Sequence, residues 1–123
     1  KTTKPKFNIK LPQKVRIDSW NTYIGEDNGS MLCICCNFSK ITQTHFQAGH
    51  IIPKSKGGSN TIDNIMPICS QCNGSMMTQN MGDYIKKYYP NNYSNFINKT
   101  YNPITNTNTN TNTWSFLGNW NKN

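Results

Sequence analysis

Residues 50–73 read H-I-I-P-K-S-K-G-G-S-N-T-I-D-N-I-M-P-I-C-S-Q-C-N, and this stretch carries most of the chain's recognisable chemistry. It begins with a histidine, continues through a Gly-Gly loop to Asn64, and ends with a C-x2-C pair that Asn73 follows. A second C-x2-C pair, Cys33 and Cys36, lies upstream. The segment therefore combines a candidate general base with half of a candidate metal site.

The two C-x2-C pairs predict a structural zinc site, because each pair presents two thiolates and two pairs complete a tetrahedron. The predicted ligands are Cys33, Cys36, Cys69 and Cys72. Cys35 could replace Cys33 or Cys36, but only the 33/36 pairing has the x2 spacing, so we treat Cys35 as a spare thiol. Free core cysteines or a disulfide pair are the alternative, and a complete disulfide framework would leave one of the five cysteines over.

The composition is that of one small, basic domain with extensions. The chain has 123 residues, only 34% of them apolar, and a formal net charge of +8. Such a charge suits a polyanion, although it is also explained by solubility and a coding bias toward Lys and Asn. No secretory segment opens the chain and no apolar run is long enough to span a bilayer. We therefore expect an intracellular, reducing compartment, a nucleic-acid partner, no membrane contact and no small-molecule cofactor.

Composition shifts along the chain predict three regions. Residues 1–11 form a basic arm, or a plain flexible terminus, and residues 12–102 form the domain, with its core at 31–82. Residues 103–123 form an Asn/Thr-rich low-complexity linker and an aromatic tail. We expect this tail to dock on its own domain; docking on a partner, including a second copy, is the alternative.

Local patterns predict an α+β fold in which helices flank a short hairpin. Gly25 is expected to stop the first helix, whose buried stripe would contain Val15, Trp20, Tyr23 and Ile24. Ser70 is expected to cap the helix that begins at the second C-x2-C pair. The expected elements are helices over 12–24, 70–79 and 81–89, an extended piece over 31–36, and strands over 44–52 and 65–68.

Polar residues in and around the two expected strands suggest phosphodiester chemistry. A neutral imidazole at His50 suits a general base near pH 7. An amide at Asn64 can bridge the loop backbone and fix the histidine, and the side-chain carbonyl of Asn73 can bind a hard cation such as Mg²⁺. Lys54 and Lys56 flank the loop, where they contact phosphates or remain ordinary solvated lysines.

Residues 31–82 resemble the HNH endonucleases, also called ββα-metal nucleases, through G-H-I-I-P, G-G, D-N-I and C-x2-C-N in this order. The resemblance implies a DNA endonuclease or nickase with one catalytic metal ion, Mg²⁺ or alternatively Mn²⁺, beside the structural Zn²⁺. It implies that His50 is the general base, that Asn64 orients it, and that Asn73 ligates the catalytic metal. The helix before the first cysteine pair is similar to the lead-in of some zinc-bearing HNH proteins of large DNA viruses.

The sequence departs from this family at Gly49, where many members carry an Asp that ligates the metal. Two interpretations follow. In the first, the metal is held by Asn73, substrate phosphates, water and another side chain. Gln47 or His45 could be that side chain, because strand alternation places both on the same face as Gly49. In the second, the site is degraded, and the domain is a zinc-stapled module that binds DNA without cleaving it. Retention of His50, Asn64 and Asn73 favours the enzyme.

Overall fold

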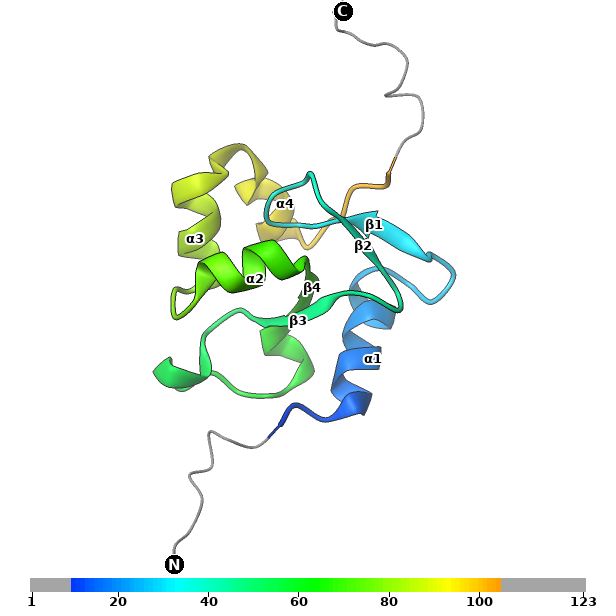
Figure 1. Ribbon diagram of the computed structural model, residues 1–123, viewed down its shortest axis with the longest axis horizontal. Coiled ribbons are helices and arrows are strands. Elements are labelled where there is room, and N and C mark those ends of the chain that lie inside the picture. Colours follow the sequence, from blue (N-terminus) through cyan, green and yellow to red (C-terminus); the bar gives the residue numbers. More distant parts are fainter. Residues whose placement is uncertain (1–9, 105–123) are drawn as a thin grey trace, which may run out of the picture.

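The computed structural model describes residues 10–104 and has the predicted α+β fold (Figure 1). Nearly all of the predicted basic arm and of the predicted linker and aromatic tail lies outside the described residues. The elements in chain order are α1 (Gln13–Tyr23), β1 (Ser30–Leu32), β2 (Lys40–Thr42), β3 (Gln47–His50), β4 (Ile65–Ile68), α2 (Ser70–Met76), α3 (Met81–Tyr88) and α4 (Tyr93–Asn98). Short 3₁₀ helices, η2 (Lys54–Lys56) and η3 (Ile62–Asn64), lie between β3 and β4, and η4 (Pro90–Asn92) precedes α4.

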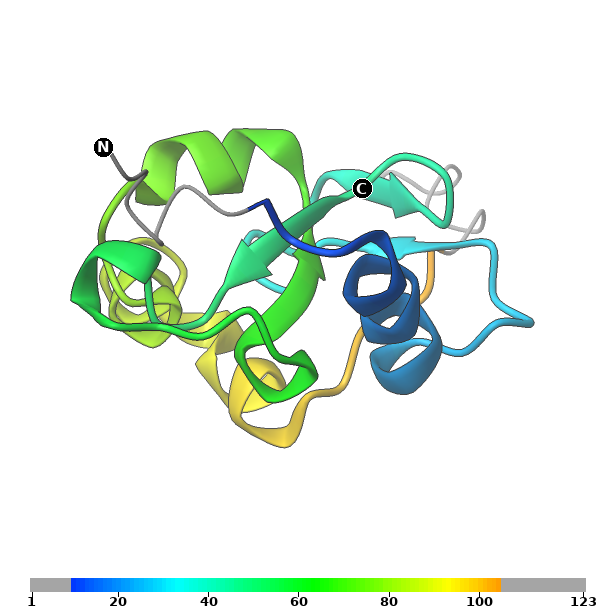
Figure 2. The same cartoon turned by 90° about the horizontal axis from the view of Figure 1, so that it is seen from below.

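The antiparallel hairpin β3–β4 lies at the centre of the domain, with α1 on one side and α2 and α3 on the other (Figures 1 and 2). Gln47 pairs with Ile68 and His50 pairs with Ile65, so the hairpin opens into its loop directly after His50. All four residues of β4 are buried, which matches the continuous apolar run in the sequence. This central position explains why β4 is apolar on both faces.

The first helix begins and ends close to the predicted residues. Pro12 is the N-cap, where its fixed φ and missing N–H are tolerated. Gly25, with φ +112°, takes the left-handed backbone that ends the helix. Trp20 is buried and donates its indole N–H to the Asn28 carbonyl at 2.9 Å, which anchors the helix to the turn that follows.

The structure corrects the predicted start of α2. Ser70 is the first residue of the helix, and the N-cap is Cys69, whose Sγ accepts the Cys72 backbone N–H at 3.4 Å. The helix is therefore capped by a sulfur atom of the cysteine cluster and not by the Ser70 hydroxyl. The strand expected from residue 44 begins only at Gln47, because Thr42 and His45 form a tight turn.

The chain returns to the central hairpin after α4. The Tyr101 hydroxyl is buried and donates to the Pro67 carbonyl at 2.6 Å, while the Asn102 carbonyl accepts the Leu32 N–H at 3.0 Å. Burial raises the pKa of Tyr101 well above its ordinary value, so the hydroxyl remains a donor. Within residues 10–104, no helix has the length and apolar character that a membrane span requires.

Candidate active site and metal centre

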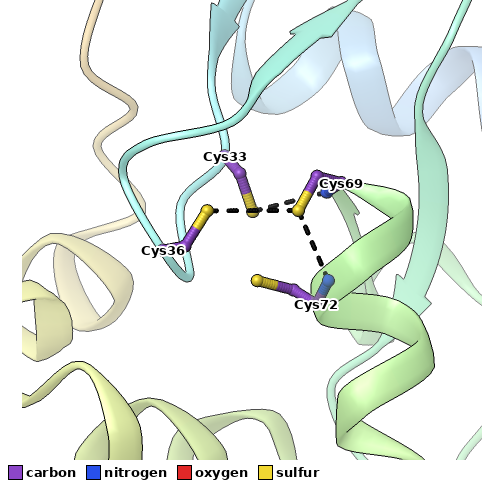
Figure 3. A group of neighbouring side chains, drawn as sticks. All are labelled: Cys33, Cys36, Cys69 and Cys72. Carbon is purple, nitrogen blue, oxygen red and sulfur yellow. Dashed lines mark hydrogen bonds between the residues drawn. The ribbon is translucent and has the colours of Figure 1, made fainter.

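The four predicted cysteines converge, as Figure 3 shows. Cys33 and Cys36 come from the turn after β1, and Cys69 and Cys72 come from the first turn of α2. Their Sγ atoms all lie within 4.8 Å of one another, and the Cys36–Cys69 pair is 4.0 Å apart. Four sulfurs at about 2.3 Å from a tetrahedral zinc would be about 3.8 Å apart. The cluster is therefore positioned to bind one metal ion and fits zinc.

Backbone donors and the pKa pattern also suit a cation. The N–H groups of Ser39, Cys69 and Cys72 donate to sulfur atoms of the cluster at 3.3–3.4 Å, which favours thiolates. Hydrogen bonds with Cys33, Cys69 and Cys72 lower the pKa of Cys36, whereas those with Cys33 and Cys36 raise the pKa of Cys69. Without a cation, the hydrogen bonds that favour the thiolate of Cys36 oppose ionisation of Cys69. A metal ion removes this conflict.

Cys35 lies outside the set of four, as the spacing predicted. Its side chain is fully buried, and its backbone carbonyl accepts the Asn92 side-chain N–H at 2.9 Å. Its hydrogen bond with Cys33 raises the pKa of Cys35, which keeps this thiol protonated. Cys35 therefore behaves as a small core residue beside the cluster.

The loop between β3 and β4 is closed by the buried Asn64. Its Oδ1 accepts the Ile52 N–H at 2.9 Å, and its Nδ2 donates to the carbonyls of Ile52 and Ser59 at 3.0 and 2.9 Å. Gly58 makes this closure possible, because a Cβ there would lie 1.7 Å from the Ile52 carbonyl oxygen. The Met81 N–H donates to the Ile51 carbonyl at 2.9 Å, which ties α3 to the start of the loop. The amide thus bridges the loop backbone.

The side chain of His50 is half-buried at the end of β3, and its partner is Asn60 rather than Asn64. The His50 Nε2 and Asn60 Oδ1 atoms are 2.8 Å apart. An amide oxygen only accepts hydrogen bonds, so in the neutral imidazole this contact places the proton on Nε2 and leaves the lone pair on Nδ1. Sequence reasoning missed Asn60; the only signal was an amide inside a loop that must fold back on itself.

Gly49 is enclosed by apolar side chains. A Cβ at this position would lie 2.5 Å from Ile68 Cδ1 and 3.1 Å from Met81 Cε. An Asp here would need both side chains to move, and its carboxylate would enter apolar surroundings. His45 and Gln47, the two candidates to replace that acid, are exposed and line a separate groove with Arg16.

Asn73 lies on the fourth residue of α2, directly after the buried Cys72, and is exposed. Among residues 10–104, the four cysteines are the only converging group of three or more Cys, His, Asp or Glu side chains. Mg²⁺ prefers near-octahedral oxygen ligands that include carboxylates. One amide oxygen does not make such a site, so the chain fits a catalytic cation only where phosphate oxygens and water complete the ligand set.

The two loop lysines both belong to η2, where Lys56 is exposed and Lys54 is half-buried and has a contact of its own. On α3, Lys86 and Lys87 lie over the rings of Tyr93 and Tyr88, at 4.8 and 5.2 Å from their centroids. The lysines of α3 therefore contact aromatic rings of α3 and α4.

Residues 33–89 match the model of the HNH endonuclease family, which confirms the resemblance predicted from the sequence. The match begins at the first cluster cysteine and ends just past α3, and it covers somewhat less than half of the 123 residues. No curated protein and no solved structure matches the chain.

Proposed function

We propose that this HNH-family domain is a divalent-metal-dependent endonuclease that hydrolyses phosphodiester bonds of DNA. The observation that carries the proposal is the held imidazole of His50. Its Nε2 is fixed by Asn60 Oδ1 at 2.8 Å, and it stands at the mouth of a loop that Asn64 closes. A histidine with one nitrogen held and the other free has the geometry of a general base.

In the proposed reaction, Nδ1 of His50 takes a proton from water, and the resulting hydroxide attacks the phosphorus. The bond from phosphorus to the 3′ oxygen breaks, and this oxygen leaves with a proton from solvent. Asn60 holds the imidazole, while Asn64 keeps the loop closed around it. Positioned base catalysis typically contributes about 10²–10⁴-fold.

The two metals have different proposed roles. Zinc bound by the four cysteines would hold the first turn of α2, and so would place Asn73, which is next to Cys72. When bound, Mg²⁺ or Mn²⁺ supplies positive charge for the leaving oxygen. Asn73 would contribute one oxygen ligand, with the remainder from phosphate and water.

A plasmid-nicking assay with Mg²⁺ tests the proposal. His50→Ala is expected to lower the rate about 10²–10⁴-fold while the DNA dissociation constant stays close to that of the wild type. Asn73→Ala should raise the Mg²⁺ concentration that gives half-maximal rate. Asn98→Ala is the matched control, because Asn98 is exposed on α4. Equal nicking by the wild type and the His50 and Asn73 variants would refute the assignment.

The second candidate function is a zinc-stapled module that binds DNA without cleaving it. It is favoured by the enclosure of Gly49, where Ile68 and Met81 occupy the space that an acidic ligand would need. DNA binding by the wild type without nicking, in either Mg²⁺ or Mn²⁺, would support this candidate over the nuclease.

The remaining expectations are proposals of the same kind. We propose a domain over 12–102 with its core at 31–82, contacts from Lys54 and Lys56 to phosphate, and an intracellular location. The similarity to HNH proteins of large DNA viruses also stays a prediction. The proposed partner is DNA alone, and a dimer through the aromatic tail has no support.

A further inference from the structure

A second polar surface lies away from His50, at the opposite end of β3. It is a groove of about 480 Å³ between α1, β2, the β2–β3 turn and the start of α2. Its polar lining includes Arg16, Lys40, His45, Gln47 and Gln71. No Asp or Glu lines it. We propose that this groove binds a backbone phosphate of the nucleic acid that the domain acts on, which rests on the function proposed above.

The cations of the groove are available to an anion. Within residues 10–104 the single ion pair joins Lys14 to Asp18, so neither Arg16 nor Lys40 is neutralised by a carboxylate there. Arg16 is also held in place, since it donates to the Phe46 carbonyl and its Cζ lies 4.1 Å from the centroid of the Phe46 ring. A guanidinium has five N–H donors, so this anchoring leaves donors for a ligand.

Neutral donors face the same groove. The Gln71 Oε1 accepts the Ser39 hydroxyl at 3.2 Å, which leaves its amide N–H groups for a ligand. Gln47 is exposed on β3. Two cations combined with amide donors form the set that contacts phosphate oxygens in protein–nucleic acid complexes. A cationic partner would find no complement here, because no carboxylate lines the groove.

The groove and His50 lie at the two ends of β3. Figure 2 shows β3 crossing this face between α1 and α2 and leading into the loop that follows it. Gln47 and His50 are the first and last residues of β3, so they are separated by about 10 Å at about 3.3 Å per residue. A duplex strand carries one phosphate per about 3.4 Å of its axis. The length of β3 therefore corresponds to about three phosphates. Strand alternation turns the Gln47 and His50 side chains to opposite faces, so a bound strand reaches both only by passing around the edge of β3.

The salt dependence of DNA binding by the full chain tests the inference. Lys40→Gln removes one groove cation at an exposed position, and Lys99→Gln removes the same charge from an exposed residue at the end of α4. Affinity for a labelled duplex is measured by fluorescence anisotropy between 50 and 300 mM salt. Each lost phosphate contact reduces the slope of log K against log salt by about 0.9, which corresponds to about fivefold at 0.15 M.

We expect this change for Lys40→Gln and a smaller one for Lys99→Gln. Gln47→Glu, which adds a negative charge in the groove, should weaken binding more than Asn98→Asp, which adds it on exposed α4. If each groove variant binds the duplex with the same affinity and salt slope as its control, the groove proposal is overturned and the nuclease proposal stands. Acidic protein segments would then be the remaining class of ligand for the groove. A wild type that binds no duplex would overturn both.

Discussion

Asn64→Ala removes the three hydrogen bonds that close the loop between β3 and β4. The lost partners are the Ile52 N–H and the carbonyls of Ile52 and Ser59, all within 3.0 Å of the amide. At a net 0.5–1.5 kcal/mol per bond, the free energy of unfolding should fall by about 1.5–4.5 kcal/mol. Ile52 is 45% exposed, so water will replace part of what is lost. We therefore expect the lower half of this range, about 1.5–3 kcal/mol.

The assay is urea unfolding of the zinc-loaded protein, followed by far-UV circular dichroism. With a slope of about 2 kcal/mol/M, the midpoint should fall by about 1 M, while the slope itself stays unchanged. Asn64→Asp keeps the acceptor but directs a carboxylate at two carbonyl oxygens, so it should be destabilised at least as much. Asn98→Ala is the surface control and should stay within about 0.5 kcal/mol of the wild type.

The reasoning is refuted if Asn64→Ala matches Asn98→Ala. Such a result would mean that the loop backbone is satisfied equally well by water. Zinc content must be measured for each variant, because loss of metal would lower stability by a different route. An Asn64 variant that retains its metal and loses stability isolates the contribution of the loop.

Three further predictions concern the metal, the loop and the imidazole. Chelation of the metal should unfold the domain, because structural zinc contributes about 10 kcal/mol or more and a typical domain is stable by only about 5–15 kcal/mol. A circular dichroism spectrum that chelator leaves unchanged would contradict this. Gly58→Ala should lower the melting temperature because its Cβ meets the Ile52 carbonyl, whereas Gly29→Ala, with open space around it, should not; equal melting temperatures would count against the loop geometry. Asn60→Ala should slow nicking without weakening DNA binding. Asn60→Asp should shift the acidic limb of the pH–rate profile to higher pH, because a carboxylate beside His50 favours the charged imidazole. An unchanged profile would argue against this contact.

The metal cluster could be predicted from the sequence because its information is local. Each C-x2-C turn fixes two sulfurs by itself, and the ion joins the turns whatever the chain does between them. The closeness of His50 and Asn64 follows from the hairpin, in which His50 pairs with Ile65, whereas the catalytic roles of His50, Asn64 and Asn73 remain predictions. The strand over 65–68 was predicted to the residue.

What sequence reasoning missed depends on contacts between distant residues. The space beside Gly49 is filled by Met81, thirty-two positions away, and no local pattern reports that. The helix α4 has only six residues, three of them Ser or Asn, and it is stabilised through the buried Phe96. The strand β2 has three residues and only Ile41 buried, which is too short for alternation to be recognised.

The bonds made by Tyr101 and Asn102 have a consequence for the order in which the chain folds. These residues close onto Pro67 and Leu32, which are synthesised thirty to seventy positions earlier. Tyr23 likewise waits for the Ile62 carbonyl, thirty-nine positions later. Contacts with such sequence separations are costly in loop-closure entropy, so we expect them to form late in folding. The cysteine cluster is complete once residue 72 is synthesised, so metal binding can precede the contacts of Tyr101 and Asn102 and stabilise a partly folded chain until they form.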